Sequence, residues 1–169
     1  YVFWEVDKRQ AEWVVVAYLS GDANMLSVVE AGTDTHVHTA ALMFNVEAEV
    51  IEYDSKVIGQ NTDSDTISEL RLGDSILRRF HSALPRRMSG RQCGKKSNHG
   101  LNYDEGYKEF ALINEIEPSE ARRIVELYHR IYPGIRSIYY ETVKRHLQKD
   151  RTLTNCFGRK VRFMDAWGP

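Results

Sequence analysis

The chain has 169 residues, a formal net charge of −1 and two cysteines. A hydrophobic fraction of 42% and a charged fraction of 28% exclude a disordered or collagen-like chain. The longest apolar run, WVVVAYL, is far below the roughly 18 residues that a membrane-spanning helix requires, and the first residues do not resemble a signal peptide. We therefore expect a cytoplasmic globular protein of one domain or two small lobes, with reduced thiols and no membrane partner.

The near-zero net charge conceals an uneven distribution. Residues 47–74 contain eight acids and two bases, whereas residues 75–103 contain seven bases and no acid. A second basic tract, residues 144–162, contains seven bases and one acid. The two basic tracts permit a polyanionic partner, although solvated helix faces would explain them equally well.

A strand and a helix are predicted to open the chain. The stretch YVFWEVD is rich in aromatic and β-branched residues and predicts a strand that ends at Asp7. A helix then begins near Gln10 and ends at Gly21, because glycine readily adopts the left-handed conformation that closes a helix. Apolar residues at helical spacing, with Trp13 and Val16 apolar as well, indicate that this helix is largely buried; those at helical spacing are Ala11, Val14, Val15, Tyr18 and Leu19.

Two capped helices follow, and the next part of the chain is less regular. Asp22 can cap the segment ANMLSVVEA as a helix, and Thr33 or Asp34 can cap the segment THVHTAALMF. Residues from about 45 to 72 are polar, acidic and weakly periodic. They predict a surface excursion, which we call the acidic insert, with a strand at EVIEY.

The second half of the chain is predicted to be helical up to a terminal hairpin. GDSILRRFHSAL predicts a helix that stops before Pro85, and another helix begins near Arg86 and continues to Tyr103, although its three glycines each cost about 1 kcal/mol relative to alanine. Pro118 opens a further helix, and the pair Pro133–Gly134 separates it from the next, so that the two form an antiparallel or angled pair. RTLTNCFGRKVRF predicts a two-stranded hairpin. The predicted fold class is α+β and mainly helical.

Four residues of the predicted helix through RQCGKKSNHGLNY are set four apart: Arg91, Lys95, His99 and Tyr103. We call them the basic-aromatic stripe. A spacing of four advances about 40° around a helix, so the stripe spreads over about 120° of one face along roughly 18 Å. Two cations a turn apart suit a polyphosphate, and two flat rings suit a base, as in a nucleoside triphosphate. An exposed basic helix face is the alternative interpretation.

Two carboxylates lie near the start of the chain. Asp7 ends the predicted strand, where it could bind Mg²⁺ together with substrate phosphates or simply cap the helix that follows. Glu12 lies within a hydrophobic helix, where burial of its charge would cost several kcal/mol unless it is paired or faces a cleft. The HVH pair at residues 36–38, with either cysteine, is a weak match to a metal site.

Several ordered motifs resemble the family A DNA polymerases. VDKRQAEWVVVAYLSGDANML is similar to their first catalytic motif, with Asp7 followed by Gln10 and Glu12, and AGTDTHVHTAALMF resembles the next block, in which an acid and a histidine open a fingers helix. RQCGKKSNHGLNY matches the fingers helix pattern of Arg, Lys, aromatic and Tyr, although His99 stands where the family usually has Phe or Tyr. YPGIRSIYYETVKRHLQKDRTLTNCFGRKVRF resembles the helix pair and hairpin that follow. The likeness is closer to phage enzymes than to bacterial repair enzymes.

The resemblance implies a role for each matching position. Asp7 is the implied catalytic residue and would bind both Mg²⁺ ions, with the backbone carbonyl of Lys8 as a further ligand. The implied substrate-binding residues are Gln10 near the incoming nucleotide, Glu12 as the steric gate against a ribose 2′-hydroxyl, His36 at the β-phosphate, Arg91 at the γ-phosphate, Lys95 at the triphosphate, His99 on the sugar and base, and Tyr103 at the templating position.

The resemblance also implies a right-hand polymerase fold, of which the chain supplies a palm strand and helix and the helical fingers subdomain. Residues 1–32 would belong to the palm, residues 33–132 to the fingers with the acidic insert, and residues 133–169 would return toward the palm. The implied activity is template-directed DNA synthesis, in which a deoxynucleoside triphosphate is joined to a primer 3′-hydroxyl by two Mg²⁺ ions. The parent protein would be a monomer that binds primer–template DNA in the cytoplasm, including that of a phage-infected host.

The last motif of the family, a His-Asp-Glu run that supplies the second metal-binding aspartate, does not occur in the sequence, since Asp165 has other neighbours. We therefore expect an incomplete fragment of a longer polymerase, which alone would be close to inert because two-metal transfer needs both aspartates. The alternative, from another functional class, is a noncatalytic nucleotide- or nucleic-acid-binding module derived from a polymerase.

Overall fold

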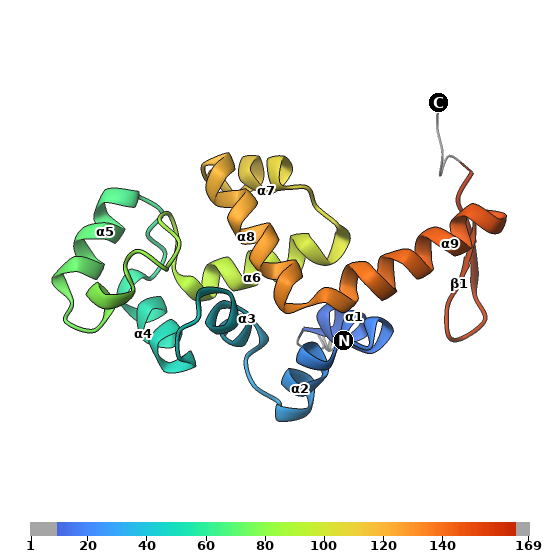
Figure 1. Cartoon of the computed structure of the whole chain (residues 1–169), viewed down its shortest axis with the longest axis horizontal. Coiled ribbons are helices and arrows are strands. Elements are labelled where there is room, and N and C mark those ends of the chain that lie inside the picture. The colour runs from blue at the N-terminus through green and yellow to red at the C-terminus, as the bar shows by residue number, and fades with distance from the viewer. Residues whose placement is uncertain (1–9, 165–169) are drawn as a thin grey trace, which may run out of the picture.

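The computed structural model describes residues 10–164, which fold into nine α-helices, short 3₁₀ and π turns and a two-stranded antiparallel sheet (Figure 1). The α-helices are α1 (Ala11–Ser20), α2 (Ala23–Ala31), α3 (Thr35–Phe44), α4 (Ala48–Ile58), α5 (Ser64–Gly73), α6 (Gly90–Gly100), α7 (Tyr107–Asn114), α8 (Pro118–Ile131) and α9 (Glu141–Asp150). The turns are η1 (Leu77–Phe80), η2 (Leu101–Tyr103) and the π turn η3 (Ile135–Tyr140), and the strands are β1 (Thr152–Thr154) and β2 (Lys160–Arg162). This confirms the mainly helical α+β class. The predicted strand that ends at Asp7 lies outside the described residues.

The first three helices have the predicted boundaries. Gly21 and Gly32 close α1 and α2 with φ angles of 60° and 63°, which glycine adopts without steric cost. Asp22 caps α2 by accepting hydrogen bonds from two backbone N–H groups. Of the two candidates for the next cap, Asp34 is the residue that caps α3.

Helix α1 buries a different face from the predicted one. Val15, Tyr18 and Leu19 are 54%, 65% and 57% exposed, so the prediction that this apolar stripe is buried is wrong. The buried residues are Trp13, Val16, Ala17 and Ser20. Because WVVVAYL is apolar on every side of the helix, its periodicity could not select one face.

The acidic insert is helical, so the predicted strand at residues 49–53 is wrong. Helices α4 and α5 pack against each other, and their inward-facing residues recur at intervals of three and four. Two of these buried positions hold charges, Asp54 and Arg71. Charged residues on the inner face break the apolar pattern from which helices are predicted, and this explains the error.

The helix predicted over GDSILRRFHSAL is reduced to the single 3₁₀ turn η1. The helix predicted from Arg86 begins four residues later, at Gly90, where the Ser89 side chain accepts a hydrogen bond from the Gln92 N–H. It continues as α6 and η2 to Tyr103, as predicted.

The end of the described chain, α9 with the strands β1 and β2, forms an extension that we call the arm. Pro118 opens α8, and α9 runs at an angle to it after the break at Pro133 and Gly134 (Figure 1). Strands β1 and β2 form the predicted hairpin, with Leu153 opposite Val161. None of the helices within residues 10–164 is both long and apolar enough to cross a membrane.

The corner between α8 and α9 is tied to α2. One carboxylate oxygen of Asp22 caps α2, and the other accepts a hydrogen bond from the Gly134 N–H at 2.8 Å. The Asn24 side chain also donates to the Ile131 carbonyl at 2.7 Å. A Cβ atom at residue 134 would lie 2.9 Å from the Asp22 Cβ, so this close approach requires glycine. The segment LSGD, residues 19–22, thus fixes through Asp22 the point at which the chain turns from α8 toward the arm.

Helices α3, α6 and α8 pack around the centre of the core. At the crossing of α3 and α6, a Cβ on Gly94 would lie 2.2 Å from the His36 carbonyl oxygen, so the two backbones are in direct contact. The Thr39 hydroxyl donates to Asn98 Oδ1 and also hydrogen-bonds with the Tyr132 hydroxyl, at 3.0 and 2.9 Å. These buried bonds fix how far each helix is shifted along its neighbour.

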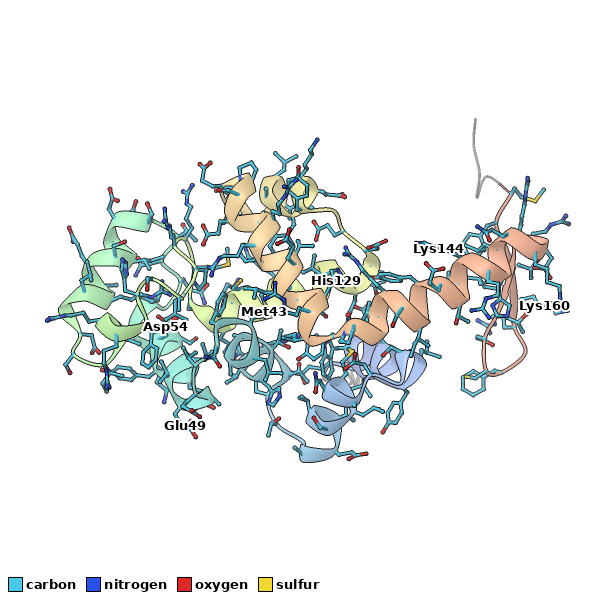
Figure 2. The ribbon with its side chains drawn as sticks, in the orientation of Figure 1. Met43, Glu49, Asp54, His129, Lys144 and Lys160 are labelled. Carbon is cyan, nitrogen blue, oxygen red and sulfur yellow. The ribbon has the colours of Figure 1, made fainter. Side chains whose placement is uncertain are left out.

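Charged residues are unevenly distributed along the long axis of the molecule. The acidic insert, with Glu49 and Asp54, lies at one end, and the arm, with Lys144 and Lys160, lies at the other (Figure 2). Helix α6, which carries most of the basic-aromatic stripe, lies between these two ends (Figure 1).

Candidate functional site

The basic-aromatic stripe lies along the side of α6 and η2 that faces the starts of α3 and α1. Arg91, Lys95 and His99 are all close enough to His36 for their positive charges to lower its pKa. Lys95, His99 and Tyr103 line one wall of an open groove of about 570 Å³, and Glu105 and Glu109, before and within α7, line the other wall. The four-residue spacing therefore does place the stripe on one side.

Arg91 forms an ion pair with Asp34. Its Nη2 and Nε lie 2.8 and 3.2 Å from Asp34 Oδ2, and both side chains are partly buried. Burial alone would raise the pKa of Asp34, but hydrogen bonds from Arg91 and from the N–H groups of Val37 and His36 outweigh it and hold that pKa below its usual value. Asp34 therefore stays ionised and joins the first turn of α3 to the first turn of α6.

His36 is a buried, neutral imidazole. Burial, with the neighbouring charges of Arg91, His99 and Lys95, lowers its pKa to about 4, although Asp34 acts in the opposite direction. Asn98 Nδ2 lies within hydrogen-bonding distance of His36 Nδ1 and of the Thr35 carbonyl. Because the Asn98 oxygen already accepts from Thr39, its nitrogen must donate to Nδ1, and this assigns the His36 proton to Nε2. His36 can therefore offer an N–H donor to an anion at neutral pH.

His99 is exposed on α6 and lies over His36. The two ring centroids are 5.9 Å apart and the planes are tilted by 38°. Lys95 is also exposed, one turn earlier on α6. The stripe thus changes along its length from a cationic end at Arg91 and Lys95 to a ring-bearing end at His99 and Tyr103.

Glu12 and Tyr103 meet at the far end of the stripe. Partial burial and, to a smaller extent, a hydrogen bond to the Glu12 carboxylate raise the pKa of Tyr103, a residue that is 66% exposed. Glu12 is itself exposed, so the cost that burial of this carboxylate in an apolar helix would carry does not arise. It lies on the solvent side of α1, turned toward η2, and pays no large desolvation penalty.

The remaining predicted site residues lie at the start of the chain. Gln10 precedes α1 with φ at 57° and lines a cavity of about 180 Å³ together with Thr33, Asp34 and Thr35. Asp7 and Lys8 lie outside the described residues. The described part of the site therefore comprises Gln10, Glu12, His36 and the stripe.

Sequence reasoning missed two residues that organise this site. Asp34 was recognised only as a cap, and Asn98 was not recognised at all, although the first holds Arg91 and the second orients His36. Their partners are 57 and 62 residues away in the sequence. The sequence offered one signal for Asp34, its place two residues before His36 in the motif AGTDTHVHTAALMF, and none for Asn98.

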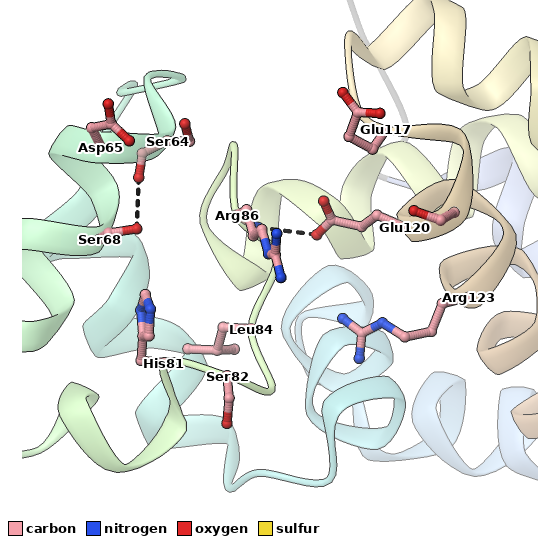
Figure 3. A pocket seen from close by; sticks show the side chains of 11 residues that line it. Ser64, Asp65, Ser68, His81, Ser82, Leu84, Arg86, Glu117, Glu120 and Arg123 are labelled. Carbon is pink, nitrogen blue, oxygen red and sulfur yellow. Dashed lines mark hydrogen bonds between the residues drawn. The ribbon is translucent and has the colours of Figure 1, made fainter.

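A larger cavity, of about 670 Å³, lies away from the stripe between α5, the segment before α6 and the start of α8 (Figure 3). Acidic and basic side chains both line it, and Glu120 accepts a hydrogen bond from the Arg86 N–H. Its lining residues are Ser64, Asp65, Ser68, His81, Ser82, Leu84, Arg86, Glu117, Ser119, Glu120 and Arg123. Acids and bases line both this cavity and the groove beside the stripe, so charge does not decide between them. The stripe is the better candidate site because its cations and rings converge with His36 from α6, η2 and α3.

The alternative metal site at the HVH pair receives no support. Burial raises the pKa of the Cys93 thiol to about 12, which disfavours the thiolate that binds metals. Across residues 10–164, no group of three or more His, Cys, Asp or Glu side chains is arranged to hold a metal ion.

The chain is similar in sequence to known DNA polymerases. The thermostable DNA polymerase I of Thermus aquaticus is 25% identical over 155 residues, which cover 92% of this chain. DNA polymerase I of Treponema pallidum is 26% identical over 164 residues, which cover 95% of it. The chain is a homologue of the polymerase region of family A DNA polymerase I. No family model matches the sequence.

The fold agrees with that of a polymerase domain. The solved structure described as the POL domain of Pol1 from M. smegmatis, in complex with DNA primer-template and dNTP, superposes with a TM-score of 0.64 at 22% identity, covering 94% of this chain. The chain spans only 13–14% of the length of the two curated relatives and 21% of the chain of that structure. The reported relatives are bacterial, and the expected likeness to phage enzymes stays a prediction.

Proposed function

We propose that this chain supplies the fingers and an adjoining part of the palm of a DNA polymerase, and binds the incoming deoxynucleoside triphosphate for template-directed DNA synthesis. The observation that carries the proposal is the stripe, which faces His36 at its cationic end and Glu12 at its ring-bearing end. A ligand that is polyanionic at one end and flat at the other fits this polarity. Homology to DNA polymerase I supports it.

The cationic end suits the triphosphate. Arg91 offers the γ-phosphate the guanidinium N–H groups that Asp34 does not accept, and exposed Lys95 offers a mobile charge near the reacting phosphorus. His36, neutral and protonated at Nε2, donates a hydrogen bond to the β-phosphate without adding charge. Together these residues neutralise and orient the phosphates, which is most of what a protein contributes to phosphoryl transfer.

The ring-bearing end suits the sugar and the base. His99 presents a face for stacking, and Tyr103 lies beside the templating position. Glu12 is held next to Tyr103, where its carboxylate blocks a ribose 2′-hydroxyl. Gln10 lies close to the same end of α1.

Mg²⁺ would be held by Asp7 and the backbone carbonyl of Lys8, which precede α1 in the sequence. One carboxylate and one carbonyl suit Mg²⁺ because substrate phosphates complete its octahedral shell, and bound Mg²⁺ neutralises charge on the transferring phosphate. The cationic end of the stripe provides for such phosphates in the described part of the site. We propose that the parent protein is a cytoplasmic monomer that binds primer–template DNA, with residues 1–32 in the palm, 33–132 in the fingers and 133–169 returning to the palm.

Binding of Mg–dATP to the 169-residue chain tests this function. We expect Arg91→Ala and Lys95→Ala each to weaken binding about tenfold, because each removes a charged hydrogen-bond donor. Lys144→Ala, on the distant arm, is the matched control and should leave the affinity within twofold. Equal affinities for all four proteins, measured by calorimetry, would refute the proposed site.

Asp7→Ala separates the proposal from the alternative of a noncatalytic binding module. A polymerase site should lose most of its Mg²⁺-dependent affinity when this carboxylate is removed. A module that keeps only the phosphate grip should bind dATP equally well with and without Asp7, and equally in Mg²⁺ and in chelator.

A further inference from the structure

The acidic insert contains a buried ion pair that is directed at α6. Asp54 and Arg71 are 0% and 1% exposed, and Arg71 Nε and Nη2 donate to the two Asp54 carboxylate oxygens at 2.7 and 3.1 Å. The two side chains come from α4 and α5 and meet as a planar fork on a carboxylate. They hold the two helices of the insert together.

The rest of the hydrogen-bonding capacity of this pair goes to the segment that leads into α6. Arg71 donates to the Pro85 and Met88 carbonyls at 2.5 and 3.1 Å. Asp54 Oδ2 accepts from the Gly90 N–H, the first residue of α6, at 2.7 Å. The pair therefore grips this segment from both sides, by its carbonyl groups and by an N–H group.

The first turn of α6 is held closely as a result. A Cβ atom on Gly90 would lie 2.9 Å from Ile51 Cδ1, so α4 packs directly on this residue. Arg91 is the next residue, and its guanidinium reaches Asp34 at the start of α3. The position of the stripe's first cation thus depends on two contacts, one to the insert through Gly90 and one to α3.

We propose that Asp54 and Arg71 are positioning residues, which fix the first turn of α6 and so aim Arg91 at the phosphate end of the site. A buried ion pair is often no more stabilising than apolar residues of the same volume, so stability alone does not account for it. Directional bonds to two carbonyls and one N–H specify position, which apolar packing does not. That this positioning serves phosphate binding rests on the proposed function. That the ion pair positions Arg91 does not.

The variants Asp54→Asn and Arg71→Lys test the pair, each with Mg–dATP affinity and the NMR signal of Arg91 Nε as readouts. We expect both variants to weaken Mg–dATP binding about tenfold and to shift the Arg91 Nε signal toward that of an unpaired arginine. Ile67→Ala is the matched control, because Ile67 is a fully buried residue of α5. It should lower stability but leave the affinity within twofold and the Arg91 signal in place.

The double variant Asp54→Leu/Arg71→Met covers the case in which the single variants fail to fold, because it removes both charges together and retains buried volume. It should fold, weaken binding about tenfold and shift the Arg91 signal. Folded variants with the wild-type Arg91 signal and wild-type affinity would overturn the proposal. If the wild-type chain binds no Mg–dATP, the proposed function fails, and the Arg91 signal still decides whether the pair positions that residue.

Discussion

Arg91 is the residue whose surroundings most constrain the site. Its guanidinium is ion-paired with Asp34, whose pKa is held below the usual value, so the carboxylate is charged throughout the neutral range. A phosphate that approaches Arg91 must share it with this carboxylate and also meets its negative charge. Asp34 therefore competes with the ligand that Arg91 is proposed to bind.

The variant Asp34→Asn should bind Mg–dATP about threefold to tenfold more tightly, because it removes the competing charge. The asparagine oxygen can still accept from the N–H groups of His36 and Val37, so the cap of α3 is retained. Asp63→Asn is the control, since Asp63 caps α5 within the acidic insert and should not affect binding. An unchanged or weaker affinity for Asp34→Asn, measured by calorimetry, would show that Asp34 does not compete.

Sequence reasoning at the residue scale succeeded where spacing along one helix carries the information. Arg91, Lys95, His99 and Tyr103 share one side because a four-residue step nearly matches a helical turn. Partners from another helix leave no such mark, and for this reason Asn98 could not be found. The exposed face of α1, which carries Glu12, was not predictable either, because the helix is apolar on most sides.

The crossing of α3 and α6 decides the geometry of the site at the scale of elements. Gly94 lets the two backbones touch, and the contact point is the carbonyl of His36 itself. Any side chain at residue 94 would separate the helix that carries His36 from the helix that carries the stripe. The glycines that argued against a helix in the sequence therefore include one that the packing requires.

Gly94→Ala should destabilise the chain by about 1–3 kcal/mol, because overpacking outweighs the higher helix propensity of alanine. Gly73→Ala is the matched control. Gly73 also lies in a helix, but a Cβ there would meet nothing within 4 Å, so this variant should be neutral or more stable by up to about 1 kcal/mol. Chemical denaturation of both variants measures the difference. Equal stabilities would mean that α3 and α6 can separate without cost.

Helix boundaries were predictable where a cap and a glycine lie in the sequence, as in α2 and α3. The acidic insert was not, because its buried face includes Asp54 and Arg71 and so lacks the apolar period of a helix. The burial of these two charges depends on their pairing with each other across 17 residues, and on backbone groups before α6. Such compensation is a property of the folded chain and not of a local pattern.

Two histidines, buried His36 and half-buried His129, make the stability of the whole molecule depend on pH. Burial lowers the pKa values of His36 and His129 to about 4, with Arg136 adding to the effect at His129. The unfolded chain takes up protons at these residues near pH 6.5, whereas the folded chain does so only near pH 4. The free energy of unfolding therefore decreases as the pH falls through this window.

We expect each of these histidines to remove about 1–2 kcal/mol from the free energy of unfolding between pH 7 and pH 5. Urea denaturation at the two pH values measures this loss. His36→Gln and His129→Gln should each reduce it by the share of the replaced residue. The double variant should leave only a smaller remainder, to which His38 contributes because burial lowers its pKa as well. A loss of the same size in the double variant and in the wild-type chain would assign the pH dependence to other groups.

The separation of charge between the acidic insert and the basic arm has a consequence for encounters in solution. The arm is the positive end of an elongated molecule, because residues 144–162 contain seven bases and one acid, whereas Arg78 and Arg87 partly offset the acids of the insert at the other end. The molecule therefore has an electric dipole along its length. A polyanion at a distance exerts a torque on that dipole and turns the arm toward itself before any contact forms. Added salt screens the torque within roughly 10 Å at 0.1 M, so productive collisions should become rarer as ionic strength rises.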